Sequence, residues 1–184
     1  MSLLDELRRR FARPPEAVRA ALDADEQALA WGRLARDEGW LVATPRGLRT
    51  LGADGGLGEP LPWHEIGSAT WSSTGQTGGT FTVTPLAEVE PGVQARLPVL
   101  RHVLTDAGDL PAIVRRRVDQ TVVASQRSPL PGRGGVLLVA RRIPGQAERE
   151  WTVVFDDDAD RADPVAREVA RQKLADLVAA DQPE

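Results

Sequence analysis

The strongest constraint on the fold is an alternation of side chains in residues 61–86. Thr80, Thr82 and Thr84 alternate with Phe81 and Val83, so an extended segment there has one polar and one apolar face. Residues 61–71 form a second β-like segment, and the stretch 72–79 between them contains three glycines, which suit a chain reversal. The pattern predicts an antiparallel β-hairpin. We expect one core to contain its large apolar residues, namely Trp63, Ile66, Trp71, Phe81 and Val83.

Length and composition exclude several classes of function. A chain of 184 residues buries about 70% of its unfolded surface, which is enough for a substantial core. Cysteine is absent, which excludes disulfides, thiolate metal sites and a cysteine nucleophile. The net charge of −4 gives no basic footprint for nucleic acid, so we expect no nucleic-acid partner.

The first residues predict an amphipathic helix. Ser2 and Asp5 have the spacing of a capping box, and the apolar residues that follow fall on one helical face. Such a helix binds an anionic membrane, docks on a partner, or packs on its own domain. Acidic residues near the start argue against a signal peptide, and no window has the roughly 18 apolar residues of a membrane span, so we expect a cytoplasmic protein. The residues assigned to this membrane- or partner-binding helix are Leu3, Leu4, Leu7, Arg8 and Phe11.

The region 25–120 predicts a strand-rich core that ends in a helix. Short β-like runs flank the hairpin, and Asp109 precedes a helical pattern that runs to Val118. A glycine-containing loop at residues 52–60 lacks the following helix and the Lys-Ser/Thr pair of a phosphate cradle, which indicates a connector. The expected strands outside the hairpin cover residues 29–34, 40–42, 48–51 and 93–104, the last broken by Pro98.

The region 121–184 predicts a β-meander followed by a helix. Asp163 and Pro164 form an N-terminal helix signal, and an apolar stripe follows it. About sixty residues make a marginal core on their own, so we expect this part to pack on the first. The chain is therefore divided into residues 1–24, 25–120 and 121–184. The expected strands are 121–126, 135–143 and 151–155, and the expected stripe is Val165, Ala166, Val169, Ala170, Leu174 and Leu177.

Two segments carry a resemblance to a known fold family. The runs Trp40-Leu41-Val42-Ala43-Thr44-x-Arg46-Gly47-Leu48 and Leu61-Pro62-Trp63-His64-Glu65-Ile66 resemble bacterial pleckstrin-homology-like (PH-like) domains over about half of the chain. The whole chain also resembles uncharacterised actinobacterial proteins. The resemblance implies an α+β fold with an antiparallel PH-like core, places Trp63 and Ile66 in that core, and carries over no catalytic residue. The fold class that we expect is this core with its helix, preceded by the N-terminal helix and followed by the meander and C-terminal helix.

The residues that could carry chemistry are few. His64, between Trp63 and Glu65 at the start of a strand, and His102, which alternates with Leu100 and Leu104, are the only histidines. Their positions indicate partly buried structural roles rather than catalysis. The acidic run 156–163 alternates as a calcium loop does, but Arg161 and Arg167 occupy the positions where such a loop has glycine and glutamate. We therefore expect no metal, no cofactor and no catalytic residue, and assign the acids to the start of the last helix.

These observations favour a non-catalytic protein-interaction or scaffold module, because the edges of a strand-rich fold can accept a partner strand or helix. One alternative is peripheral membrane binding through the N-terminal helix. A further alternative is an enzyme acting on an unknown small molecule, which would need a deep polar pocket.

Overall fold

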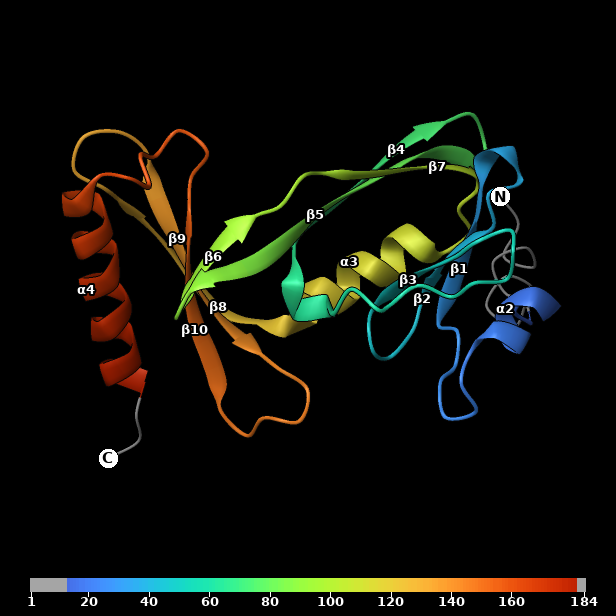
Figure 1. Cartoon of the computed structure of the whole chain (residues 1–184), viewed down its shortest axis with the longest axis horizontal. Helices are drawn as coiled ribbons and strands as arrows, with labels where there is room; N and C mark the ends of the chain where they lie inside the picture. Colours follow the sequence, from blue (N-terminus) through green and yellow to red (C-terminus); the bar gives the residue numbers. More distant parts are fainter. Residues whose placement is uncertain (1–12, 182–184) are drawn as a thin grey trace. The chain divides into compact units, whose positions relative to one another are not determined.

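The computed structural model describes residues 13–181, so the predicted helix of Leu3, Leu4, Leu7, Arg8 and Phe11 lies outside the described residues. The fold is mixed α+β (Figure 1). The chain forms two compact units. Unit 1 comprises Met1–Pro85 and Pro98–Val118, and unit 2 comprises Leu86–Leu97 and Asp119–Glu184. Residues 86–97, which the sequence places with the first half, thus belong to unit 2.

Unit 1 is built on an antiparallel sheet with the strand order β3-β2-β1-β7-β5-β4. The meander of β1, β2 and β3 joins the set of β4, β5 and β7 where β1 pairs with β7, and most of the helix α3 follows in the same unit. The elements of this unit are α2 (Glu16–Ala21), β1 (Ala30–Leu34), β2 (Trp40–Ala43), β3 (Leu48–Leu51), β4 (Ile66–Thr74), β5 (Gly78–Glu90), β7 (Leu100–Asp106) and α3 (Leu110–Thr121), with two short 3-10 helices at Ala35–Asp37 and Trp63–Glu65.

The predicted hairpin is formed by β4 and β5. Both strands extend into the stretch 72–79 that was expected to form the loop. Thr74 pairs with Gly78, and only residues 75–77 form the turn. Gly79 lies inside the strand, and no larger residue fits at this position. A Cβ atom there would be 2.3 Å from the Ser72 carbonyl oxygen and 2.7 Å from the indole of Trp71. This glycine therefore makes room for a cross-strand tryptophan.

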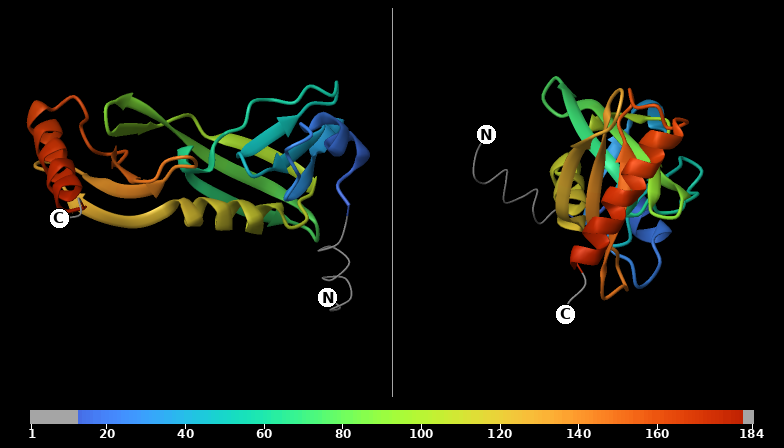
Figure 2. Two further views of the ribbon diagram at one scale, coloured as in Figure 1. Left: turned by 90° about the horizontal axis from the view of Figure 1, so that it is seen from below. Right: turned by 90° about the vertical axis from the view of Figure 1, so that its left-hand side faces the viewer.

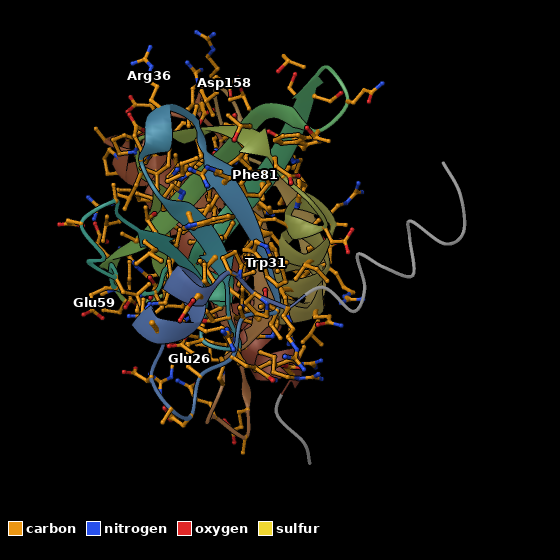
Figure 3. The ribbon with its side chains drawn as sticks, turned by 90° about the vertical axis from the view of Figure 1, so that its right-hand side faces the viewer. Glu26, Trp31, Arg36, Glu59, Phe81 and Asp158 are labelled. Carbon is orange, nitrogen blue, oxygen red and sulfur yellow. The ribbon has the colours of Figure 1, made fainter. Side chains whose placement is uncertain are left out.

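The predicted core of unit 1 is confirmed. Trp63, Ile66, Phe81 and Val83 are buried in one cluster, and Trp71 packs against it while half-buried. Figure 3 shows Phe81 inside the unit. Leu104 from β7 and the α3 residues Leu110, Val114 and Val118 complete the cluster, so one face of α3 covers this side of the sheet.

The two segments that carry the family resemblance are interlocked. The buried Thr44 hydroxyl accepts hydrogen bonds from the backbone N–H groups of Arg46 and Gly47 and donates to the Gly47 carbonyl, which closes the turn between β2 and β3. The Trp63 indole donates to the Thr44 carbonyl at 3.1 Å. A Cβ atom at Gly47 would lie 2.2 Å from the carbonyl oxygen of Leu61, so only glycine fits there. These motif residues therefore build the fold.

Unit 2 contains a sheet with one helix against it (Figure 2). The strand order is β6-β10-β9-β8, and β5 continues from unit 1 to pair with β6 through residues 86–90. Residues 93–104, expected as one strand broken by Pro98, form β6 and β7, which both pair antiparallel with β5 on either side of that break. Their second partners differ, because β6 pairs with β10 in parallel and β7 pairs with β1. The elements are β6 (Val93–Arg96), β8 (Val122–Pro129), β9 (Gly135–Arg142), β10 (Arg149–Phe155) and α4 (Pro164–Asp181).

The helix α4 begins as the sequence predicts. The Asp163 carboxylate accepts a hydrogen bond from the Val165 N–H at 2.9 Å, and Pro164 is the first helical residue. Ala166 and Ala170 are buried, and Val169, Leu174 and Leu177 pack against the same cluster as Val153 and Phe155. Val165 was wrongly included in the stripe: it is 57% exposed, because it lies in the first turn on the margin of a face centred on the two alanines. None of the described helices has the length and apolar character required to cross a membrane.

Candidate functional site

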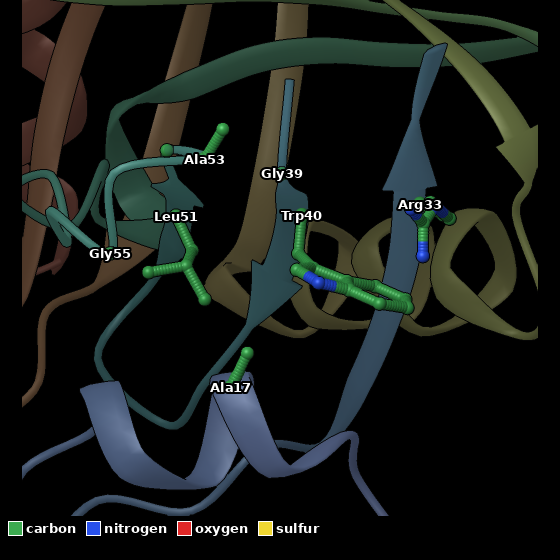
Figure 4. A pocket seen from close by; sticks show the side chains of 8 residues that line it. Ala17, Arg33, Gly39, Trp40, Leu51, Ala53 and Gly55 are labelled. Carbon is green, nitrogen blue, oxygen red and sulfur yellow. The ribbon is translucent and has the colours of Figure 1, made fainter. Parts of the chain in front are cut away.

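A small cavity of about 220 Å³ lies beside α2 on the β2–β3 side of unit 1 (Figure 4). The Arg33 guanidinium stacks over the Trp40 ring, 5.4 Å from its centroid, and together they form the polar and aromatic part of the wall. The lining residues are Ala17, Arg33, Gly39, Trp40, Leu51, Gly52, Ala53 and Gly55.

The chemistry of this cavity is limited to binding. Its lining offers one guanidinium, one indole and aliphatic or backbone groups, without a carboxylate, imidazole, hydroxyl or thiol side chain. A general base or a nucleophile requires one of the missing groups or an amine. The volume is also below the roughly 300–1,000 Å³ typical of small-molecule sites. This is not the deep polar pocket that the enzyme alternative needs.

A buried ion pair stabilises the segment between α2 and β1. Glu26, whose side chain is 1% exposed, accepts a hydrogen bond from Arg49 at 2.5 Å. The Nε of Arg49 donates to the Gly58 carbonyl at 2.8 Å. Arg46 lies at the rim, where its guanidinium contacts Asp23 and Asp25, and the nearby Asp25 charge is the main reason that the pKa of Arg46 is raised. Each cation has a local acid, so the cluster is structural.

The two histidines lie in different surroundings. His64 is half-buried in the 3-10 helix before β4, and its Nδ1 is buried without a hydrogen-bond partner. His102 lies opposite Phe81 on β7, and burial lowers the pKa of its imidazole. Neither imidazole hydrogen-bonds to a hydroxyl within residues 13–181, so the structure does not assemble a base and nucleophile around them.

The acidic run after β10 is held by separate arginines. Asp156 pairs with Arg127 at 3.2 Å and Asp157 pairs with Arg96 at 2.9 Å. Asp163 caps α4. The described part of the chain contains no group of three or more acidic or histidine side chains placed to hold a metal ion. These contacts fix the strand end and the start of the helix.

The outer edge of the unit 1 sheet at β4 is the most distinctive exposed feature. Along residues 13–181, β4 pairs with β5 on one side and with no strand on the other. The opposite edge of this sheet, β3, is covered by the following loop: Leu48 and Leu61 exchange two backbone hydrogen bonds, and the Gly58 N–H donates to the Thr50 carbonyl. One edge of this sheet is therefore covered by a loop, whereas the described residues leave the other edge without a partner strand.

The sequence of β4 leaves this edge open. Its nine residues, Ile-Gly-Ser-Ala-Thr-Trp-Ser-Ser-Thr, include no charged residue and no proline. Natural sheets protect exposed edges with charges, prolines, short strands or covering loops. One bulge, at Gly67, interrupts the start of β4, and pairing with β5 is regular from Ser68 to Thr74. The regular part is an unprotected template for another strand.

The outward face of this edge is rich in hydroxyl groups. Ser68, Thr70 and Ser72 lie opposite Thr84, Thr82 and Thr80, and the Ser68 hydroxyl donates to Thr84 Oγ1 at 3.1 Å.

The sequence predicts the alternation of side chains but not the exposed edge of the sheet, because the pairing of β7 and the covering of β3 depend on residues far away in the chain. Comparisons with family models, with curated proteins and with solved structures find no match for this chain.

Proposed function

We propose that this chain is a non-catalytic protein-interaction module whose PH-like unit 1 binds an extended segment of a partner along β4. The observation that carries the proposal is the uncharged free edge of β4 in a sheet whose other edge is covered. Strand addition of this kind derives its affinity from main-chain hydrogen bonds, and alternate side chains determine its specificity.

The PH-like assignment of unit 1 is supported by its connectivity. Several short antiparallel strands precede a helix, which is the order that the resemblance implies. Thr44, Gly47 and Trp63 hold the two resembling segments together. The limited chemistry of the cavity and the separation of the histidines favour binding over catalysis.

The proposal is tested by the binding of a synthetic peptide that can add to β4 as a strand. The probe is a capped, fluorescent nonapeptide of alternating threonine and valine, whose two faces match the polar and apolar faces of β4. Its binding to the full-length chain is measured by fluorescence anisotropy at chain concentrations low enough that the edge of β4 is not occupied by a second copy. We expect binding to the wild type and loss of binding to the Thr70→Lys/Ser72→Lys variant, since charges on an edge strand oppose pairing.

The matched control is Thr80→Lys. Thr80 lies directly opposite Ser72 on the same face but belongs to β5, which pairs on both sides. This variant should bind the peptide as the wild type does. Equal binding by the edge variant, or no binding by the folded wild type, would contradict the proposal.

A further inference from the structure

We propose that the strand that adds to β4 is β4 of a second copy, in an antiparallel arrangement with a two-fold axis at Thr70. This inference rests on the proposed function, because it names the partner of the same edge. The segment from Ser68 to Thr74 keeps regular pairing with β5, so its free side presents a straight backbone template. A two-fold axis places the same surface on both partners, so the segment must complement itself.

The sequence around Thr70 is self-complementary. An axis through Thr70 places Ser68 opposite Ser72 of the second copy and Ala69 opposite Trp71 of the second copy. Hydroxyl side chains then meet hydroxyl side chains on the outward face, while the small and large apolar residues meet on the face toward the core. Directly opposed side chains in antiparallel strands interact, and like charges there are unfavourable. No charge opposes this pairing.

The packing of Trp71 favours the same register. Ala69 and Trp71 are half-buried and pack against the core cluster, and the Trp71 ring leans over Gly79 of β5. In the register centred on Thr70, the small Ala69 lies opposite Trp71 of the second copy. An axis through Trp71 would place the two indoles opposite each other and Ala69 opposite Ser73. The opposed side chains would then match less well in size and polarity than in the register centred on Thr70.

A charge exchange tests the axis. Sedimentation velocity of the full-length chain should show a concentration-dependent dimer. Thr70→Lys and Thr70→Glu each place two like charges opposite one another at the axis, so each variant alone should lose the dimer, whereas their equimolar mixture should recover it. Thr80→Lys, on the paired strand β5, should dimerise as the wild type does.

Cysteine crosslinking gives a second measurement, because the chain has no native cysteine. Under mild oxidation Thr70→Cys should form a covalent dimer. Ser68→Cys and Ser72→Cys should crosslink when mixed but not separately. A dimer that survives Thr70→Lys, or crosslinking of Ser72→Cys alone, would overturn the assigned axis. A wild type that is monomeric throughout but binds the threonine-valine peptide would refute the self-pairing and leave the proposed function standing.

Discussion

Removal of one member of the buried pair of Glu26 and Arg49 should strongly destabilise unit 1. Glu26→Gln keeps the size of the side chain but removes the charge that faces Arg49. The Arg49 side chain is 9% exposed, and after the change it could still donate to the amide oxygen at position 26 and to the Gly58 carbonyl, but neither acceptor carries a charge. Arg46 NH1 lies 3.8 Å from the same carboxylate but is engaged by the two exposed aspartates. The guanidinium of Arg49 would thus be buried without a counter-charge.

The expected loss follows from this geometry. Removal of one partner of a buried ion pair costs about 3–5 kcal/mol, and we expect about 3 kcal/mol because the Gly58 carbonyl still accepts from Arg49. In urea, with a slope of roughly 2 kcal/mol per molar, the unfolding midpoint should fall by about 1.5 M. The assay is tryptophan fluorescence, since four of the five tryptophans, at positions 31, 40, 63 and 71, belong to unit 1.

Two controls separate charge from shape. Asp25→Asn removes an exposed partner of Arg46, whose ion pair is screened by solvent, and should change stability by less than about 0.5 kcal/mol. Replacement of both buried partners, Glu26→Leu with Arg49→Met, should restore most of the lost stability, because an apolar pair has no charge to desolvate. A loss below about 1 kcal/mol for Glu26→Gln, or a double variant as unstable as the two single variants combined, would refute this reasoning.

Three other changes test the fold. Phe81→Ala should cost roughly 3–5 kcal/mol in denaturant unfolding, because Phe81 is 1% exposed, and a loss below about 1 kcal/mol would show that the inward face of β5 is misassigned. Arg141→Met should change the free energy of unfolding by less than about 1 kcal/mol, because removal of the buried, unpartnered Nε offsets the loss of the 2.8 Å hydrogen bond from Nη1 to Thr121, and a loss above about 2 kcal/mol would contradict this expectation. Burial lowers the pKa of His102 below its ordinary 6.5, so between that lowered pKa and 6.5 the unfolded chain binds a proton that the folded chain does not. The free energy of unfolding should therefore fall as the pH drops through this window. In urea titrations at successive pH values, His102→Gln should reduce this fall.

Local patterns predicted the elements well, because the responsible interactions are close in sequence. The alternation around Phe81 gave the hairpin and its inward face, and Asp163 with Pro164 gave the start of α4. The turn at Thr44 and Gly47 closes within four residues. In each case the side chain and its partner are neighbours along the chain or across one tight turn.

The features that the sequence did not reveal depend on distant partners. Glu26 and Arg49 are separated by 23 positions, and neither lies in a pattern that predicts a buried charge. The two halves of the interrupted strand at residues 93–104 both pair with β5, but their second partners, β10 and β1, are distant in the sequence. The free edge of β4 is equally non-local, because it follows from which strand lies beside β5 and which loop covers β3.

The shared strand β5 has a consequence for the order in which the protein can fold during synthesis. Unit 1 requires β7 and α3, so the ribosome must release residues 86–97 before the first sheet is complete. Those residues include β6, whose parallel partner β10 is made later: Arg96 and the Phe155 carbonyl that it binds are 59 positions apart. Unit 1 can therefore close while one side of β6 is still unpaired, which leaves Val93 and its neighbours accessible until β10 has been made.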